Sequence, residues 1–242
     1  MSTSASVVEG AVGYRGFVPG TICIDFDDTI VTRDIAGQIL ERFAGAGWPE
    51  LRDRRRAGEL TLEQYSAAAL DLVEATEEQL VAFALEAAEP RPGLPELLDW
   101  AHWNGWHAAI VSNGWDLYID PVLRRMGVDQ LARHCGRARF VYRWQLRYLS
   151  PRGIEVNDAF KLGYAAEFKA LGDRLVWVGD GPSDIAPAQA SDMVFARDTL
   201  WETMRGGEHV HAFEDFGDVV AVLEREQSEW RKSSSSTTAG GA

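Results

Sequence analysis

The hydrophobic pattern of the chain alternates short apolar runs with helical segments, which is typical of a parallel sheet with crossover helices. The apolar runs predict strands at 20–25, 106–111, 174–179, 193–195 and 209–213. The first three lack a clean polar alternation, as expected of strands buried on both faces. Helices are predicted at 93–104, 116–126 and 158–171, each followed closely by a glycine. The pattern therefore predicts an α/β fold.

Residues 33–89 interrupt this alternation, because they contain no convincing strand. An apolar helical stripe and two Thr/Gln pairs with capping-box spacing predict about four helices there instead. These signals are Ile35, Ile39, Leu40 and Phe43 for the stripe, and Thr61 with Gln64 and Thr76 with Gln79 for the boxes. We expect this segment to be an insertion above the carboxyl end of the first strand.

The two ends of the chain lack this periodicity. Residues 1–18 are small and Gly-rich, which predicts a loose N-terminal segment. Residues 227–242 end in a low-complexity Ser/Thr/Gly/Ala stretch and are predicted to be disordered. The domain organisation expected from these shifts is a core formed by 19–32 and 90–226, with 33–89 inserted as a separate helical domain.

Composition and charge narrow the classes of partner. Lys and Arg number 24 against 37 Asp and Glu, so the net charge is −13 and nucleic acid or anionic membranes are not expected as partners. No apolar run approaches membrane-spanning length, and no signal-peptide pattern is present. The two cysteines, Cys23 and Cys135, form neither a disulfide framework nor a zinc motif. These features predict a cytoplasmic protein.

Three of the predicted strands end in polar residues that could carry chemistry. Because ligands bind outside the carboxyl ends of parallel strands, we expect these residues to converge. Asp25 and Asp27 are two positions apart in an extended segment, so both can face one site while Phe26 packs inward. The three groups are Asp25, Asp27 and Thr29; Ser112, Asn113 and Gly114; and Asp180, Gly181 and Asp184.

The residue types at these strand ends indicate phosphoryl transfer. Four carboxylates without a His or Cys partner predict Mg²⁺ as the cofactor, held by Asp25, Asp27, Asp180 and Asp184. Ser112 and the backbone N–H groups of the two following residues could bind an anion, and Lys161 adds a positive charge. A carboxylate nucleophile, a second acid, Mg²⁺, a hydroxyl and a Lys are the groups that phosphoryl transfer uses.

The four segments "DFDDT", "SNG", Lys161 and "GDGPSD" resemble the four motifs of the haloacid dehalogenase superfamily, in the expected order over about residues 20–200. The inserted helices resemble the cap of its phosphoserine-phosphatase-like branch. This resemblance implies a Rossmann-like three-layer core with a parallel sheet, and a small helical cap domain inserted after strand one. It also implies a phosphatase.

The resemblance assigns a role to each motif residue. Asp25 would be the nucleophile that forms an aspartyl-phosphate, and Asp27 would protonate the leaving alcohol and then activate water. Mg²⁺ would be held by Asp25, the Asp27 backbone carbonyl and Asp180, with Asp184 ligating or supporting it. The phosphoryl group would be held by the remaining motif residues, which are Thr29, Ser112, Asn113, Gly114 and Lys161.

Two details resemble the enolase-phosphate phosphatases of methionine salvage. "VFARDTL" at 194–200 is similar to their segment after the fourth motif, and Asp34 lies nine residues past Asp25, where they have an acidic residue. Their Cys-rich stretch before the motif lysine is absent, since this region reads "YRWQLRYLSPRGIEVNDAF". The substrate expected is therefore a small phosphorylated metabolite, with Asp34 as a candidate contact.

Two other activities fit the same motifs. A phosphomutase or phosphotransferase would use the same core, with the cap controlling the entry of water. A receiver-like phospho-switch also combines an Asp cluster, a hydroxyl and a Lys, although the insertion and the GDxxxD loop argue against it. Mg²⁺-dependent hydrolysis of a phosphomonoester is the activity that the motifs favour.

Several other features are interpreted as structural. "LRDRRR" at 51–56 is expected to be a solvated helix face, and the basic and aromatic stretch 137–148 an edge hairpin or flap. Asp28 is expected to be a solvent-facing turn residue. Two alternating histidines are too few ligands to predict a metal. Three tryptophans are expected to pack between a helix and the next strand, with a homodimer interface as a second option. These residues are His209 and His211, and Trp100, Trp103 and Trp106.

Overall fold

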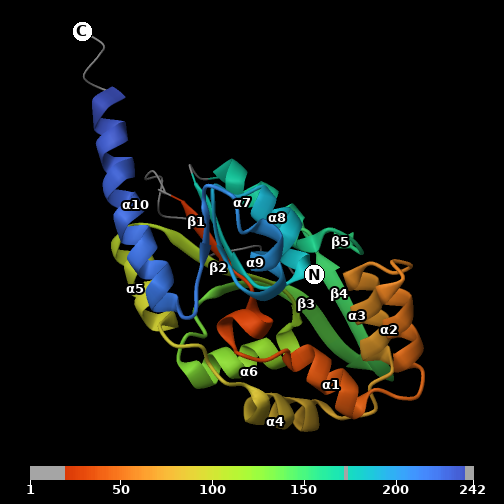
Figure 1. The fold of residues 1–242 in the computed structure, drawn as a ribbon. Helices are drawn as coiled ribbons and strands as arrows, with labels where there is room; N and C mark the ends of the chain where they lie inside the picture. The colour runs from red at the N-terminus through yellow and green to blue at the C-terminus, as the bar shows by residue number, and fades with distance from the viewer. Residues whose placement is uncertain (1–19, 172–173, 238–242) are drawn as a thin grey trace, which may run out of the picture.

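The computed structural model of the protein describes residues 20–171 and 174–237, and its centre is an eight-stranded sheet with the order β5-β4-β3-β2-β1-β6-β7-β8 (Figure 1). Neighbouring strands from β3 to β8 are parallel, whereas β4 pairs antiparallel with β3 and with β5. β1 lies between β2 and β6, as in a doubly wound fold. The strands are β1 (Thr21–Ile24), β2 (His107–Trp115), β3 (Ala132–Val141), β4 (Arg143–Leu149), β5 (Glu155–Val156), β6 (Leu175–Gly179), β7 (Met193–Ala196) and β8 (Val210–Ala212).

Helices cover both faces of this sheet and form the outer layers of a Rossmann-like fold. α5 and α10 pack on each other on one side, and α7 and α8 pack on the other (Figure 1). The fold class predicted from the sequence is therefore confirmed. The core helices are α5 (Leu94–Trp103), α6 (Asp116–Met126), α7 (Phe160–Leu171), α8 (Ile185–Gln189), α9 (Asp198–Met204) and α10 (Phe216–Thr237).

The segment between β1 and α5 forms a small helical cap. Its four helices are α1 (Ile35–Phe43), α2 (Trp48–Arg56), α3 (Leu62–Asp71) and α4 (Glu77–Ala87). Both predicted capping boxes open their helices, at Thr61 and Thr76. The chain enters and leaves the cap side by side, because Val31 bridges Pro90. α2 has no buried residue, as expected of a solvated basic helix.

The stretch 137–148 forms the predicted edge hairpin. β3 runs parallel to β2 as far as Gly136 and then pairs antiparallel with β4. The hairpin contacts cap helix α3, and the buried Trp144 donates from its indole Nε1 to the Ala75 carbonyl at 3.0 Å. The hairpin therefore joins the sheet to the cap at a second place, besides the two chain segments at Val31 and Pro90 through which the chain enters and leaves the cap.

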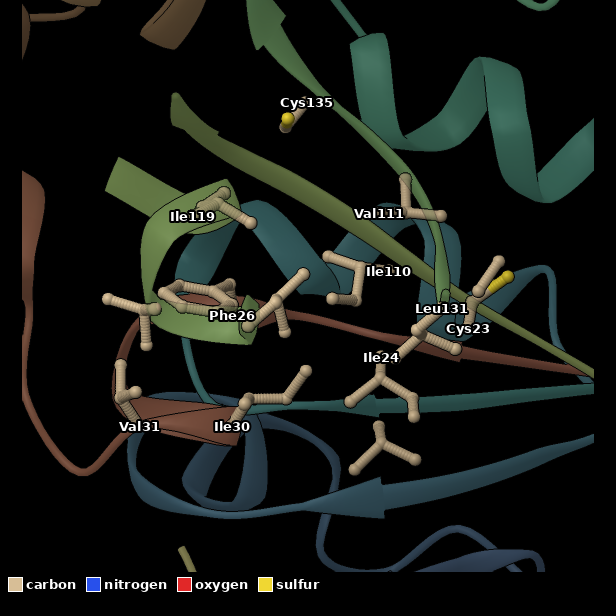
Figure 2. Close-up of a cluster of buried hydrophobic side chains, with 14 of the residues drawn as sticks. Cys23, Ile24, Phe26, Ile30, Val31, Ile110, Val111, Ile119, Leu131 and Cys135 are labelled. Atoms are coloured by element: carbon tan, nitrogen blue, oxygen red, sulfur yellow. The ribbon is translucent and has the colours of Figure 1, made fainter. Parts of the chain in front are cut away.

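The hydrophobic core lies directly beneath the end of β1. Figure 2 shows Ile24, Phe26 and Ile110 in one cluster of buried apolar side chains. Phe26 is fully buried, as predicted, so the aspartates on either side of it face away from the core. Cys23 and Cys135 are buried free thiols, and burial raises the pKa of both. This packing fixes the direction in which the polar end of β1 projects.

Two sequence predictions differ from the structure. The tail from residue 227 was expected to be disordered, but α10 continues to Thr237, because the helix begins on an apolar stripe that includes the buried Val219 and Leu223. Trp100 and Trp106 are buried as expected, but Trp103 is 82% exposed, because it lies on the solvent side of α5.

Segment 1–18, Gly172 and residues 238–242 lie outside the described residues. None of the described helices is long and apolar enough to cross a membrane.

Candidate active site

A cavity of about 240 Å³ lies at the carboxyl ends of β1, β2 and β6, beneath the cap. Most of the residues predicted from the motifs line it, together with side chains from α1 and α3. The exceptions are Thr29 and Asp184, which are fully buried. The lining residues are Asp25, Asp27, Asp28, Asp34, Ser112, Asn113, Gly114, Trp115, Lys161, Asp180, Gly181 and Ser183 from the core and adjoining loops, and Ala36, Gly37, Leu40, Leu62, Tyr65 and Ser66 from the cap.

The turn after β1 directs its aspartates into this cavity. Asp25 accepts a hydrogen bond from the Phe26 N–H at 2.7 Å, Asp27 has an extended backbone, and Asp28 has a positive φ of 54°. Asp28 is half-buried and lines the cavity, so the expectation of a solvent-facing residue is wrong. The left-handed backbone at this position turns its side chain back over the site.

Arg91 holds this turn in place, and nothing in the sequence distinguishes this arginine beyond its position at the end of the insertion. Its guanidinium donates to the Thr29 carbonyl at 2.7 Å, the Asp28 carbonyl at 2.7 Å and the Glu214 carbonyl at 2.9 Å. Arg91 is only 7% exposed. A buried cation that satisfies three backbone carbonyls fixes a loop firmly, since hydrogen bonds to charged groups are stronger than neutral ones.

Lys161 joins the first and the fourth motif. Its Nζ lies 2.7 Å from Asp25 Oδ2 and 2.8 Å from Asp184 Oδ1, and it donates to Ser183 Oγ at 3.0 Å. Burial opposes the charge of this lysine, but the two carboxylates outweigh burial and raise its pKa. Burial also raises the pKa of Asp25, which Lys161 partly offsets. The lysine is therefore a cation fixed beside the proposed nucleophile.

Asp184 supports this cluster from below. It is fully buried and accepts hydrogen bonds from Lys161, from the Trp177 indole at 2.9 Å and from the backbone N–H groups of Asp180 and Gly181 at 3.2 and 3.1 Å. A Cβ at Gly179 would lie 2.5 Å from its carboxyl carbon, so the glycine at the end of β6 permits this position. Asp184 thus organises the loop that carries Asp180.

One carboxylate oxygen from each of Asp25, Asp180 and Asp184 lies within 4.8 Å of the other two. Burial and the charges of Asp25 and Asp184 raise the pKa of Asp180, whose Oδ1 accepts from the Thr29 hydroxyl at 2.9 Å. Crowded, desolvated carboxylate oxygens fit a hard divalent cation such as Mg²⁺. The resemblance gives Asp27 a place in this set through its backbone carbonyl, and its carboxylate oxygens accept from the Ile35 N–H at 2.9 Å and from the Tyr118 hydroxyl. The expectation that the Asp27 carboxylate joins the other three therefore does not hold, whereas its backbone carbonyl stays a predicted ligand.

The "SNG" segment lies in an irregular part of β2, where the register with β3 shifts between Val111 and Trp115. The Ser112 Oγ accepts from the Gly114 N–H at 3.0 Å, so its own proton is available to a ligand in the cavity. The Asn113 carbonyl accepts from the Tyr148 hydroxyl at 2.6 Å, and its side chain donates to Glu63 at 3.1 Å. The Gly114 N–H, predicted to bind phosphate, is thus engaged within its own loop.

Glu63 is a buried cap residue that sequence reasoning missed. Its Oε1 accepts from the Asn113 amide and from the Phe160 N–H, both at 3.1 Å. It therefore joins α3 of the cap to the last part of β2 and to the start of α7, one residue before Lys161. A lone glutamate in the first turn of a helix is an ordinary feature of helices, so nothing in the sequence distinguishes it.

Asp34 lines the cavity, and its side chain also caps α1 by accepting from the Gly37 N–H at 2.7 Å. A side chain at Gly37 would overlap this carboxylate. The residue thus has a structural role that the sequence did not predict, and contact with a substrate stays a prediction.

Comparison with known proteins agrees with this arrangement. The family model for haloacid dehalogenase-like hydrolases matches residues 22–189. The chain is 32% identical to the bifunctional enzyme MtnB/MtnX of Bacillus licheniformis over 88% of its length, and it spans about half (51%) of that relative. It is 25% identical to 2-hydroxy-3-keto-5-methylthiopentenyl-1-phosphate phosphatase of Bacillus pumilus, with 87% of this chain and 94% of the relative covered.

Solved structures share the fold. A phospho-aspartyl intermediate analogue of phosphoserine phosphatase superposes with a TM-score of 0.63 at 17% identity, covering 85% of this chain and 99% of that one. A probable phosphoserine phosphatase from Vibrio cholerae has a TM-score of 0.64 at 25% identity, covering 88% and 67%. With the family model matched over most of its length, this chain belongs to the haloacid dehalogenase-like hydrolases.

Proposed function

We propose that the protein is a Mg²⁺-dependent phosphomonoester hydrolase that acts through Asp25. One observation carries this proposal: the Asp25 carboxylate lies 2.7 Å from the Lys161 ammonium in a cavity that also receives Asp27, Ser112 and Asp180. A carboxylate held beside a fixed cation and a second carboxyl group has the components for phosphoryl transfer through a covalent intermediate.

The reaction proceeds in two steps. In the first, an Asp25 oxygen forms a bond to phosphorus, the bond from phosphorus to the ester oxygen breaks, and Asp27 gives its proton to that oxygen. In the second, Asp27 takes a proton from water as the water oxygen bonds to phosphorus and the bond to Asp25 breaks, which releases inorganic phosphate.

Lys161 and the Ser112 hydroxyl offset the charge on the phosphoryl oxygens during both steps. Burial, the nearby charge of Asp34 and that of Asp25 raise the pKa of Asp27, although its hydrogen bonds with Tyr118 and Ile35 oppose the shift, which suits a group that must first hold a proton. Mg²⁺ bound by Asp25 and Asp180 would supply further positive charge to the phosphoryl group.

The lining of the cavity favours a substrate with an apolar end. Of the described residues that line it, Lys161 alone is cationic, and it already contacts Asp25 and Asp184. The carboxylate of phosphoserine would therefore lack a cation there. On the cap side, Leu40, Leu62 and Tyr65 offer apolar surface. We accordingly extend the proposal to the substrate named for the relatives, 2-hydroxy-3-keto-5-methylthiopentenyl-1-phosphate, whose methylthio end is apolar.

This substrate is expected to be hydrolysed with a kcat/KM at least about 100-fold above that of phosphoserine, because discrimination by unpaired charge is large. EDTA should remove the activity with both, and Mg²⁺ should restore it.

Leu62→Ala should lower kcat/KM about tenfold for the methylthio substrate, since about 1–2 kcal/mol of apolar contact is lost. p-Nitrophenyl phosphate, which has no such tail, is the control substrate. Equal kcat/KM for phosphoserine would contradict the substrate assignment but not the hydrolase.

A further inference from the structure

Tyr118 of α6 is a fully buried tyrosine whose hydroxyl donates to Oδ2 of Asp27. Its ring contacts those of Phe26 and Trp115, with centroid distances of 6.0 and 5.7 Å, so the position of the hydroxyl is fixed by packing. The other oxygen of Asp27 accepts from the Ile35 N–H at 2.9 Å, at the start of α1. Asp27 is therefore held by the core on one oxygen and by the cap on the other.

Gly114 makes room for this contact. A Cβ at this position would overlap the Tyr118 hydroxyl and would lie 3.0 Å from Asp27 Oδ2. Values below about 3.4 Å are tighter than ordinary packing between carbon and its neighbours, so a side chain here would displace one of the two groups. The glycine of "SNG" thus serves the approach of Tyr118 to Asp27, apart from any contact with phosphate.

We propose that Tyr118 is a positioning residue that keeps Asp27 aligned for proton transfer, an inference that rests on the proposed function. Asp27 must be protonated before the first step and ionised before the second. A hydroxyl both donates and accepts hydrogen bonds, so Tyr118 can bind Asp27 in either form without moving its ring. Phenylalanine would keep the packing and lose this bond, which leaves the Asp27 carboxyl held by the Ile35 N–H alone and less well aligned with the ester oxygen.

Tyr118→Phe is tested with two esters of similar shape, phenyl phosphate and p-nitrophenyl phosphate. The nitrophenolate leaves without a proton, whereas phenolate depends on the acid. General acid catalysis contributes about 10²–10⁴-fold, so we expect kcat/KM to fall about tenfold or more for phenyl phosphate and less than about threefold for the nitrophenyl ester. This ratio would not change if Tyr118 only stabilised the fold.

Tyr164→Phe is the matched control, because its partly buried hydroxyl donates to the Leu149 carbonyl at 3.0 Å and lies outside the cavity. It should leave both rates unchanged. Gly114→Ala is the second variant, and its cost for phenyl phosphate should be smaller when Tyr118 is already Phe. An equal loss on both esters, or none, overturns the assignment. Hydrolysis of both esters by the wild type is a separate test of the proposed function.

The outer face of the β3–β4 hairpin is rich in arginine. On a chain of net charge −13, this face carries four arginines, and Arg137 lies directly opposite Arg147 in the sheet register. Like charges in opposed positions weaken a sheet unless an anion lies near them. Arg137 forms no ion pair with a described side chain. The other three pairs are Arg139 with Asp116, Arg143 with Asp71 and Arg147 with Glu155.

The tip of the hairpin is apolar and exposed, and an acidic groove lies beside it. Phe140, Val141 and Tyr142 are 60%, 50% and 97% exposed. The groove lies between this tip and the α3–α4 loop, and its floor includes Val73 and Ala75. Its rim carries four carboxylates, of which only Asp71 pairs with Arg143. These are Asp71, Glu74, Glu77 and Glu78.

We infer that this surface, formed by residues 139–143 and 71–78, binds a second copy of the chain. A basic, aromatic tip and an acidic, apolar groove lie side by side on one face, and a two-fold interface brings each against its counterpart in the partner. The tip of each copy then covers the groove of the other. The occupant follows from charge complementarity. Glu74, Glu77 and Glu78 of the groove form no ion pair with a described side chain, and the guanidinium groups of Arg139 and Arg143, although paired within the chain, stay mostly exposed.

Sedimentation over a range of protein concentrations tests this interface. We expect a dimer whose dissociation constant rises about tenfold or more in 0.5 M salt, since its charge contacts are screened. Tyr142→Ser with Phe140→Ser should give a monomer with unchanged phosphatase activity per chain. Trp103→Ser is the control, because Trp103 is also a largely exposed aromatic residue but lies on α5. A wild type that stays monomeric, or a dimer dissociated only by Trp103→Ser, overturns the inference.

Discussion

Replacing Asp25 by Asn is expected to lower phosphatase turnover by about 10³-fold or more, because loss of a nucleophile removes the covalent route altogether. The variant should still fold, since the amide oxygen can accept from the Phe26 N–H at the same position. Wild-type enzyme quenched in acid during turnover should carry one phosphoryl group, and peptide mass spectrometry should locate it on Asp25. The Asn variant should carry none.

Asp28→Asn is the matched comparison, because Asp28 lines the same cavity three residues away but has no described contact between its carboxylate and Lys161. We expect it to keep activity within about tenfold of the wild type, as is usual for a change outside the reacting groups. Undiminished turnover by Asp25→Asn, or a phosphoryl group trapped on Asp27 or Asp28, would contradict the role of Asp25.

The positions of the motif aspartates could be predicted because they depend on the sheet alone. A buried strand ends in a polar residue at the edge where parallel strands present ligands, so Asp25 and Asp180 converge as soon as β1 and β6 pair. Phe26 gives the direction in addition, since an apolar residue between two aspartates must face the core. These inferences need only strand periodicity and topology.

Glu63, Arg91 and Tyr118 could not be predicted, because each acts through contacts between distant parts of the chain. In the sequence, Tyr118 is one more aromatic residue on the apolar stripe of α6. Its hydroxyl contacts Asp27 only because α6 packs against the turn after β1. In the sequence, Arg91 is a cation at the end of the insertion. In the structure it binds the backbone carbonyls of Thr29 and Glu214, which are far apart in the chain. Helical periodicity identifies a buried face but not the atoms it touches.

The second large effect that we expect concerns the buried support of the site. Asp184→Ala should lower the free energy of unfolding by about 3–5 kcal/mol, because breaking a buried ion pair leaves the other charge uncompensated. Lys161 would keep only Asp25 as a carboxylate partner, and the Trp177 indole and two backbone N–H groups would lose their acceptor. Urea denaturation in EDTA measures this loss, and turnover should fall with it because Lys161 and Asp180 lose their shared support.

Asp180→Asn separates this structural role from a functional one. Its pKa is raised by burial and by repulsion from Asp25 and Asp184, so the ionised carboxylate binds protons more readily in the folded state than in the unfolded one. As the pH rises from the unfolded pKa toward the folded pKa of about 8, the metal-free fold loses stability, and above the folded pKa the ionised carboxylate carries the full cost. Asn cannot ionise, so the variant should preserve or raise the free energy of unfolding in EDTA. The same variant should lose Mg²⁺-dependent activity. If Asp180→Asn destabilised the metal-free protein as much as Asp184→Ala does, the two aspartates would not divide ligand and support between them.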